Sequence, residues 1–347
     1  MDQERRINAR LAQWGLTRED DSPLTPAASK NRTVICRHGR SQRVLVKIAD
    51  GPPAHSGVVR EGEVLTRLAP LTAGGGCPLT LPRLFAFDRA LGLVAVEWLT
   101  HSETLHTYHR RTRRYGEALA RSLGRAVGFL HRVSAEQAEA LGPRSLLVEE
   151  SDLLECFLRM RPDFYARLSL AGVELFSMVQ ADAAAVSGLQ QLSESGTLEH
   201  AALLHGDLKQ ANLLRVARRG RHPLVLLDWE LSAWGDPARD LGGLVADYAL
   251  GALAPERANE VLPPPALRRA MRAMLSAYAL ERGAGFALDE ALEQRTARWA
   301  GAALLFYVYG MTHYEGELSE RGRGLVGHAA HMLAEPAQWP ALLWGTA

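Results

Sequence analysis

One stretch of the chain, residues 203–240, constrains the fold and the chemistry of this sequence more than any other. Two apolar runs with strand character, Leu213–Val216 and Leu224–Leu227, flank the basic segment Arg218–Arg221, so we expect a β-hairpin. Because a hairpin brings its two ends together, the polar side chains just outside the two runs should meet in one small space. These side chains are Asp207, Lys209, Asn212 and Asp228.

This combination of polar groups favours one kind of ligand. Two carboxylates, an amide oxygen and an ammonium group suit a nucleoside triphosphate bound with magnesium. Mg²⁺ takes one or two protein oxygen ligands and completes its shell with phosphate and water. Phosphoryl transfer also needs a carboxylate that orients the attacking hydroxyl, and cations that stabilise the charge on the transferred group.

The spacing of these residues matches a known catalytic loop. The order His-x-Asp-x-x-x-x-Asn, followed by a strand ending in Asp, is the arrangement found in kinases. Gly206 stands where protein kinases usually carry Arg, and Asp228-Trp229-Glu230 replaces their Asp-Phe-Gly. In both respects the chain resembles the aminoglycoside phosphotransferase and choline kinase family, the small-molecule branch of the protein-kinase-like fold. The resemblance extends from about residue 24 to about residue 250.

The resemblance implies a two-lobed α+β fold. Residues 1–99 would form a small nucleotide-binding lobe, with an antiparallel sheet and one helix, and residues 100–347 a larger, mainly helical catalytic and acceptor-binding lobe. The strands expected in the sheet are Thr33–Arg37, Arg43–Ile48, Arg83–Asp88 and Leu93–Trp98. A helical insertion is expected over Asp152–Gln191, where the family shapes its acceptor pocket.

A lysine and a glutamate are expected to pair in the first lobe. In the predicted helix Val58–Leu68, Glu61 lies at helical spacing from Val64 and Leu65, so it shares the inward apolar stripe. A buried carboxylate requires a cationic partner. Lys47, on the preceding strand, is the candidate, whereas Glu63 is expected on the outer, solvated face of the helix.

The resemblance also assigns roles to the catalytic loop and its neighbours. Asp207 would accept or orient the proton of the acceptor hydroxyl, and Lys209 would stabilise the transferred phosphoryl group. Asn212 and Asp228 would ligate magnesium. Asp240, just ahead of an apolar run, is expected to cap a helix and, by analogy with the family, to hold the backbone of the catalytic loop.

Nucleotide contacts are assigned to the first lobe in the same way. Lys47 would hold the phosphates of ATP, with Glu61 behind it. Ser29 lies in a loop where the family covers the phosphates, although this version of the loop lacks glycine, and a plain connecting loop is an equal alternative. Backbone groups near Glu97 and Leu99 would hold the adenine.

Composition restricts the partners. A net charge of +1 over 347 residues gives no general reason to bind nucleic acid or a membrane. The three cysteines, Cys36, Cys77 and Cys156, form no Cys-x-x-Cys pair, which favours a reducing compartment over a disulfide framework. The absence of an apolar signal segment or a long apolar run completes the expectation of a cytoplasmic protein. Oligomeric state leaves no readable pattern.

The function predicted from these features is ATP- and Mg²⁺-dependent transfer of the γ-phosphate to a hydroxyl of a small molecule: an antibiotic, amino sugar, amino alcohol or sugar. The near-neutral charge favours a neutral or weakly basic acceptor over a polycation. Two alternatives stay open, a kinase acting on Ser or Thr of a peptide, which would need an open groove, and a nucleotide-binding pseudokinase scaffold, supported only by the loss of glycine from the phosphate loop.

Overall fold

The computed structural model describes residues 2–19, 32–49, 57–74, 76–141, 152–194, 202–217, 223–250, 264–283, 286 and 288–345. The chain packs as two compact units: Met1–Leu105 with Asn212–Ser232, called the first unit here, and His106–Ala211 with Ala233–Ala347, the second unit. The hairpin after Asn212 thus packs with the N-terminal residues, although it falls in the predicted 100–347 lobe. The boundary between residues 99 and 100 stays a prediction.

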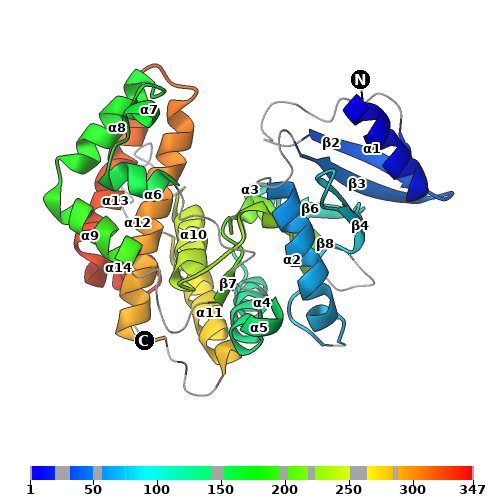
Figure 1. Ribbon diagram of the computed structural model, residues 1–347. Coiled ribbons are helices and arrows are strands. Elements are labelled where there is room, and N and C mark those ends of the chain that lie inside the picture. Colours follow the sequence, from blue (N-terminus) through cyan, green and yellow to red (C-terminus); the bar gives the residue numbers. More distant parts are fainter. Residues whose placement is uncertain are drawn as a thin grey trace. The chain divides into compact units, whose positions relative to one another are not determined.

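The first unit is organised on a five-stranded antiparallel sheet with the order β1-β2-β3-β5-β4 (Figure 1). Its strands are β1 (Leu16–Arg18), β2 (Arg32–His38), β3 (Gln42–Ile48), β4 (Leu84–Asp88) and β5 (Leu93–Glu97). The four strands predicted from the sequence are confirmed. β1 was not predicted, because three residues are too few to show an alternating pattern.

Two helices pack against this sheet through opposite faces of β3. Val44, Val46 and Ile48 share one face and form a core with Ile7 and Leu11 of α1 (Asp2–Gln13). Lys47, one residue out of phase, lies on the other face, where it meets α2 (Gly57–Thr72). The alternation of β3 therefore separates an apolar core from a charged site.

The predicted hairpin is present in the first unit. β8 (Leu213–Val216) pairs antiparallel with β9 (Leu224–Leu226), and β6 (Ser102–Thr104) adds a third strand beside β8. At its open end the Leu227 N–H donates to the Asn212 carbonyl at 3.0 Å. Asn212, just before β8, and Asp228, just after β9, therefore lie at the same open end of this short ladder. The basic segment of residues 218–221 lies outside the described residues.

The second unit is mainly helical. α4 (Glu117–Glu136) packs along α11 (Pro265–Arg282), and α12 (Glu290–Thr312) packs against α10 (Ala238–Ala249) and α13 (Glu320–Ala334) (Figure 1). A two-stranded sheet joins β7 (Ala202–Leu204) to β10 (Ala233–Gly235). The remaining helices are α3 (Leu105–Thr112), α5 (Ala138–Leu141), α6 (Asp152–Leu158), α7 (Pro162–Tyr165), α8 (Leu170–Gln180), α9 (Ala183–Glu194), α14 (Trp339–Leu343) and the 3-10 helix η7 (Pro336–Gln338).

The expected helical stretch is confirmed, and it consists of four short helices, α6 to α9. A proline at the start of α7 and Ser169 as the N-cap of α8 mark two of the new starts. With an antiparallel sheet in the first unit and helices in the second, the α+β class is confirmed.

One prediction about a surface side chain is wrong. Glu63 was expected to be solvated on the outer face of α2, but it is buried and pairs with Arg89. Arg89 belongs to the turn after β4, and α2 packs against β4. The helix is therefore covered on more than one side, which the apolar stripe alone does not reveal.

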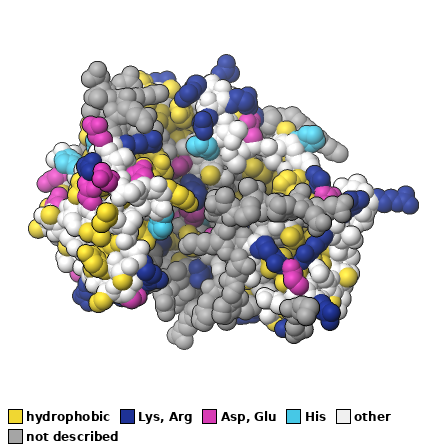
Figure 2. Space-filling model, turned by 90° about the horizontal axis from the view of Figure 1, so that it is seen from above, with side chains coloured by type: hydrophobic (Ala, Val, Ile, Leu, Met, Phe, Trp, Pro, Cys, Tyr) yellow, Lys and Arg dark blue, Asp and Glu magenta, His cyan; other side chains and the backbone are white. Residues whose placement is uncertain are grey.

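The described surface carries both signs of charge. In Figure 2 Lys and Arg side chains form separate small groups on the face in view, with Asp and Glu among them on part of it. Among the described helices, none combines the length and the apolar character that crossing a membrane requires.

Candidate active site

The first unit holds a cluster of three charged side chains. The Lys47 ammonium lies 2.6 Å from a carboxylate oxygen of Glu61 and 2.7 Å from Oδ1 of Asp228. β3 supplies the lysine, α2 the glutamate, and the end of the β8–β9 hairpin the aspartate. The predicted Lys47–Glu61 pair is therefore present, and Asp228 joins it. That third contact depends on the tertiary structure.

Burial sets the charge state of this cluster. Glu61 is only 2% exposed and the side chain of Lys47 13% exposed. Burial acts to lower the pKa of Lys47, but the carboxylates of Glu61 and Asp228 outweigh it and raise that pKa above its ordinary value. Lys47 is thus a permanent cation at neutral pH.

Asp228 adopts an unusual backbone conformation. It lies in the left-handed region, with φ of 66° and ψ of 64°, directly before the 3-10 helix η5 (Trp229–Leu231). Aspartate tolerates this region better than most residues, and such conformations concentrate at functional sites. Two contacts hold the segment: the buried Trp229 indole donates to the Leu226 carbonyl at 3.0 Å, and Arg60 of α2 donates to the Glu230 carbonyl at 3.1 Å.

The side chains just before and just after the hairpin carry oxygen atoms of the kind that bind a hard divalent cation. Asn212 contributes an amide and Asp228 a carboxylate, and the Asp228 side chain is 34% exposed. One or two oxygen ligands from the protein, with phosphate and water completing the shell, are what Mg²⁺ uses in nucleotide sites. Among the described residues there is no group of three or more His, Cys, Asp or Glu side chains that could hold a metal ion.

The catalytic-loop residues Asp207 and Lys209 lie in the second unit. The Lys209 ammonium donates to Oδ2 of Asp207 at 2.7 Å, and both side chains are partly exposed. Their proximity is confirmed. The predicted meeting of this pair with Asn212 and Asp228 stays a prediction, because those residues belong to the first unit.

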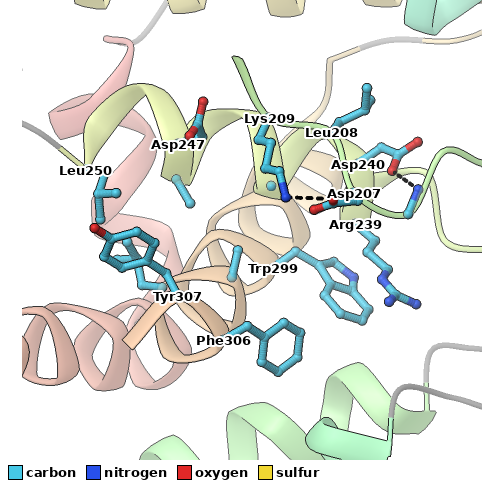
Figure 3. Close-up of a pocket in the computed structure, with 15 residues that line it drawn as sticks. Asp207, Leu208, Lys209, Arg239, Asp240, Asp247, Leu250, Trp299, Phe306 and Tyr307 are labelled. Carbon is cyan, nitrogen blue, oxygen red and sulfur yellow. Dashed lines mark hydrogen bonds and ion pairs between the residues drawn. The ribbon is translucent and has the colours of Figure 1, made fainter. Parts of the chain in front are cut away.

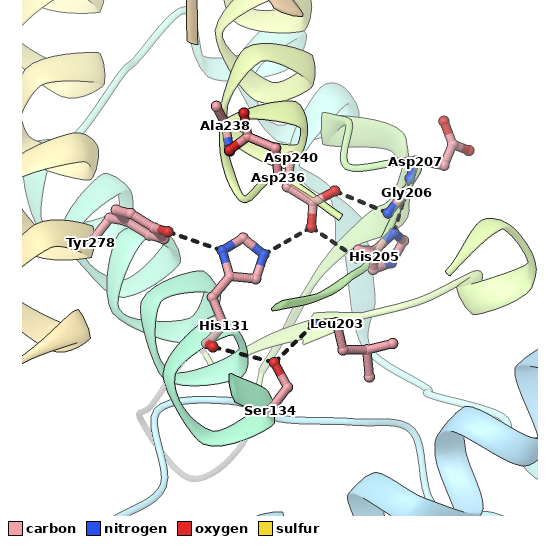
Figure 4. Close-up of polar contacts among 10 residues, drawn as sticks. All are labelled: His131, Ser134, Leu203, His205, Gly206, Asp207, Asp236, Ala238, Asp240 and Tyr278. Atoms are coloured by element: carbon pink, nitrogen blue, oxygen red, sulfur yellow. Dashed lines mark hydrogen bonds and ion pairs between the residues drawn. The ribbon is translucent and has the colours of Figure 1, made fainter. Parts of the chain in front are cut away.

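A single buried carboxylate fixes the backbone of this loop (Figure 4). Asp240 of α10 accepts the backbone N–H of His205 at 2.7 Å and that of Gly206 at 2.9 Å. Gly206 has a φ of 82°, which favours glycine at this position. His205 is fully buried, and its Nδ1 accepts the Asp207 N–H at 3.4 Å. The expected loop-holding role of Asp240 is confirmed.

The network continues away from the loop through two side chains of other helices. His131 of α4 lies 3.1 Å from Asp240 through Nε2 and 3.1 Å from the Tyr278 hydroxyl of α11 through Nδ1. Burial acts to raise the pKa of Asp240, but the hydrogen bond from His131 and the backbone N–H of Gly206 outweigh it and lower that pKa. Asp240 is therefore an ionised acceptor inside the protein.

The other predicted role of Asp240, as a helix cap, is wrong. Asp240 lies inside the first turn of α10, and its carboxylate is committed to the loop. The N-cap residue of α10 is Pro237, and the Asp236 carboxylate just before it accepts the Ala238 N–H at 3.0 Å through Oδ1 and pairs with Arg295 through Oδ2. Both carboxylates precede an apolar run, so the sequence does not distinguish their roles.

Asp207 and Lys209 border a pocket in the second unit (Figure 3). It has a volume of about 280 Å³. The catalytic loop forms one side, and α10 and α12 form the others. Of the described residues that line it, none comes from the α6–α9 insertion. Its lining residues are Gly206, Asp207, Leu208, Lys209, Arg239, Asp240, Gly243, Ala246, Asp247, Leu250, Trp299, Ala303, Leu304, Phe306 and Tyr307.

Three predicted nucleotide contacts remain predictions. Ser29 lies outside the described residues. Glu97 ends β5, where its N–H donates to the Arg83 carbonyl at 2.9 Å. Leu99 follows β5, and its carbonyl accepts the Ser102 hydroxyl at 2.7 Å. Recognition of adenine by this segment is not tested by these contacts.

Several residues at the site were not found from the sequence. His131 and Tyr278 brace Asp240, Asp247 accepts the Gln210 N–H at 2.7 Å, and Trp299 lines the pocket. Each lies within a long helix and follows no local motif. Gly242 is the one indirect indication of this packing in the sequence. A Cβ at Gly242 would lie 2.5 Å from the Trp299 Cβ, so the glycine allows α10 and α12 to pack closely.

Comparisons with known proteins identify the family and the fold of the chain. A model of the phosphotransferase enzyme family matches residues 24–273. No match was found among curated proteins. Many solved structures resemble the chain, and three of them are described here. The macrolide 2'-phosphotransferase MphH from Brachybacterium faecium is 21% identical with a TM-score of 0.53, covering 95% of this chain and 98% of that one.

The choline kinase LicA from Streptococcus pneumoniae is 17% identical with a TM-score of 0.55, and the match covers 96% of this chain and 99% of that one. The amicoumacin kinase hAmiN, in complex with AMP-PNP, Ca²⁺ and Ami, is 14% identical with a TM-score of 0.62, covering 97% and 94%. At these identities the likenesses show a shared fold.

Proposed function

This chain belongs to the phosphotransferase enzyme family and is an ATP-dependent kinase of small molecules, and we propose that Asp207, Lys47, Asn212 and Asp228 carry its reaction. The observation that supports this most strongly is the paired arrangement of the first unit: Lys47 lies against both Glu61 and Asp228. The contact with Asp228 brings Lys47 beside the carboxylate that we propose as a magnesium ligand, which supports a role for both residues at the phosphates of the nucleotide.

In this proposal the first unit handles the phosphoryl donor. Lys47 binds the phosphates of ATP, and Glu61 holds the lysine in position. Asn212 and Asp228 would hold Mg²⁺, whose chemistry when bound is to neutralise charge on the phosphate oxygens. The family's kinases use ATP and a divalent metal; magnesium on these two residues of this chain is our proposal.

The second unit handles the acceptor. Asp207 accepts the proton of the acceptor hydroxyl as its oxygen bonds to the γ-phosphorus, and the bond to the β–γ bridging oxygen breaks, so ADP leaves with that electron pair. Lys209, 2.7 Å from Asp207, fixes the carboxylate before the acceptor arrives and offers positive charge to the transferred group. Asp240 holds the loop backbone through the N–H groups of His205 and Gly206, which restricts the position of the adjacent Asp207 carboxylate.

The pocket beside Asp207 is the proposed acceptor site. It lies directly against the base and is lined by side chains from three separate segments, as small-molecule sites commonly are. This favours a small acceptor over a peptide. The acceptor itself, a neutral or weakly basic alcohol by the charge argument, is not identified by the family. We place the reaction in the cytoplasm, where ATP is available.

The direct test is phosphoryl transfer with Mg²⁺ and ATP across antibiotics, amino alcohols, sugars and Ser/Thr peptides, with the phosphorylated product identified by mass spectrometry. We expect one class of small molecule to be phosphorylated by the wild type and not by Asp207→Asn. Asp163→Asn, which changes an exposed carboxylate that pairs with Arg167, is the matched control. Equal turnover by wild type and Asp207→Asn would refute the catalytic assignment.

A further inference from the structure

Helix α10 presents two carboxylates to the catalytic loop. Asp240 and Asp247 are seven residues apart, close to two helical turns, so both side chains leave the helix on the same side. Asp240 accepts the N–H groups of His205 and Gly206 at the start of the loop. Asp247 accepts the Gln210 N–H through Oδ2 at 2.7 Å, at the other end of the loop. The loop is therefore attached to one helix face at both of its ends.

The middle of the loop also lies against this face. Gly243 stands between the two carboxylates on α10, and a Cβ at this glycine would lie 3.3 Å from the Leu208 carbonyl oxygen. A side chain at this position would crowd the loop, so the glycine allows the backbone of Leu208 to approach the helix. Figure 3 shows Leu208 and Lys209 between Asp240 and Asp247. The loop is thus supported at its middle as well as at its two ends.

A second contact joins Gln210 to Asp247. The Gln210 side chain donates through Nε2 to the Asp247 carbonyl at 3.3 Å, and Gln210 is only 7% exposed. Each residue therefore uses both its backbone and its side chain in the pair. Gln210 directly follows Lys209, whose ammonium contacts Asp207. The peptide group that Asp247 holds is consequently the one that joins Lys209 to Gln210.

The two carboxylates of α10 differ in their electrostatic surroundings. Burial acts to raise the pKa of both. At Asp240 the hydrogen bond from His131 outweighs burial, and the pKa is lowered. At Asp247 burial outweighs the hydrogen bonds from Gln210, and the pKa is raised. The site at Asp247 therefore favours the ionised carboxylate less, and a neutral amide oxygen should be able to accept the Gln210 N–H there.

We propose that Asp247 is a positioning residue of the phosphoryl transfer, which holds the Gln210 end of the catalytic loop and so keeps Asp207 in place to accept the acceptor proton. The inference rests on the proposed function, because it takes Asp207 as the base. Asp240 alone fixes the residues before Asp207. With both ends held on one helix, movement of Asp207 is restricted, and a misplacement of about 1 Å can cost on the order of 10²-fold in rate.

Two other roles of Asp247 lead to different measurements. Asp247 also lines the pocket beside Asp207, so it could instead contact the acceptor directly, and its loss would then raise KM for the acceptor. A purely structural role would lower stability and leave the kinetic constants of the folded protein unchanged. Positioning of the base lowers kcat, because the contact with Asp207 matters when the proton is transferred.

The kinetic test follows ADP release from ATP and Mg²⁺ by the full chain, with the best acceptor of the panel above and with water alone. For Asp247→Ala we expect kcat to fall by roughly 10-fold, while KM for ATP and for the acceptor changes by less than about 3-fold. Asp247→Asn can still accept the Gln210 N–H, so its kcat should stay within about 3-fold of the wild type. A raised acceptor KM with unchanged kcat, or an Asn variant as slow as the Ala variant, would overturn the proposal.

A double-mutant cycle shows whether Asp247 acts through Asp207. In the Asp207→Asn background the base is already lost, so Asp247→Ala should lower kcat by less than about 3-fold instead of by about 10-fold. The full reduction in that background would mean that Asp247 acts on another group, and the positioning role would be refuted.

Amide hydrogen exchange tests the loop without any turnover. In Asp247→Ala we expect exchange in peptides that cover residues 205–210 to be about 10-fold faster, with exchange in α4 and α11 unchanged. Asp182→Ala is the matched control, because its carboxylate accepts the N–H groups of Ala184 and Ala185 at 3.0 Å, at the start of α9 and outside the pocket. It should change neither loop exchange nor kcat. Unchanged loop exchange in Asp247→Ala, or faster exchange throughout the second unit, would contradict local positioning.

Failure of this inference is distinguishable from failure of the proposed function. If Asp207→Asn turns over as fast as the wild type, the proposed function is rejected. If Asp207→Asn loses turnover while Asp247→Ala keeps the kcat and the loop exchange of the wild type, Asp207 remains the base, and only the positioning role of Asp247 is rejected.

Discussion

The two units fix their key side chains by different physical means. In the first unit, Lys47 is held by direct ion pairs with Glu61 and Asp228. In the second unit, Asp207 makes a partly exposed contact with Lys209, and the backbone on which it stands is held by the buried carboxylate of Asp240. The first unit therefore keeps the Lys47 ammonium charged, and the second unit holds the backbone that carries Asp207 in a fixed conformation.

This difference follows from the task proposed for each unit. A group that binds phosphate must stay charged when it is buried, and ion pairs with carboxylates ensure this. A base that takes a proton must remain accessible, so rigidity has to come from the backbone behind it. Hydrogen bonds from backbone N–H groups to an ionised carboxylate supply that rigidity without covering the base. The comparison predicts that mutations in the two units will separate activity from stability.

The largest effect is expected for Asp207→Asn, on activity alone. General-base catalysis contributes about 10²- to 10⁴-fold to rate, so kcat should fall by roughly 10³-fold. The free energy of unfolding, measured by urea titration, should change little, since the Asp207 side chain is partly exposed and contacts an exposed lysine. A large loss of stability would show that Asp207 is also structural and would weaken the contrast between the units.

Lys47→Met should reduce both nucleotide affinity and stability. It leaves Glu61 buried without its cation, and breaking such a pair costs about 3 kcal/mol or more in the free energy of unfolding. Because the pKa of Lys47 is raised in the folded state, the stability that the pair supplies is present below about pH 10.5 and is lost as pH rises through the folded value.

The double variant Lys47→Met with Glu61→Gln provides the control for that prediction. It removes both charges, so most of the lost stability should return while ATP binding, followed by calorimetry, stays weak. If the double variant were as unstable as Lys47→Met alone, the loss would come from packing and not from the unpaired charge.

Asp240→Asn should destabilise the protein by about 2 kcal/mol at neutral pH, because charge-assisted hydrogen bonds to the loop and to His131 are weakened. The pKa of Asp240 is lowered below its ordinary value of 3.8, so its contribution is present above pH 4 and is lost as pH falls below that value. Unfolding free energy measured against pH should therefore decline less steeply below pH 4 in the variant. An identical acid slope would contradict the assignment.

Tyr278→Phe tests the far end of the same network and should have the smallest effect. It removes one hydroxyl that contacts His131, which is worth about 1 kcal/mol. Stability should fall by that amount, while kcat changes by less than about twofold. A loss of kcat as large as that of Asp240→Asn would mean that the catalytic loop depends on the whole chain of contacts from α11.

The sequence predicted the parts of the site that are local along the chain. The β8–β9 hairpin, with Asn212 and Asp228 at its ends, follows from two short apolar runs and a turn. The inward position of Glu61 follows from helical spacing, and Lys47 follows as the cation that such a buried carboxylate requires. Each of these predictions uses a pattern within one helix or strand pair, or the need of one buried charge for a partner of opposite sign on a neighbouring element.

The sequence did not distinguish side chains whose roles depend on packing between helices. Asp236 and Asp240 lie close together in the chain, yet the Asp236 carboxylate accepts an N–H at the start of α10, while the Asp240 carboxylate, inside the first turn, holds the catalytic loop. Glu63 looks solvated by periodicity and is buried against Arg89. Trp299 belongs to no local motif, and it lines a pocket where α10 and α12 pack closely.

The sequence by itself therefore determined the α+β class, the catalytic loop and the kind of reaction, because these depend on motifs with fixed spacing. The tertiary structure alone decided that Asp228 joins Lys47, that His131 and Tyr278 stand behind Asp240, and that Trp299 lines the pocket beside Asp207. These contacts join residues far apart in the chain. Spacing along the sequence cannot specify them, since they arise only when whole elements pack.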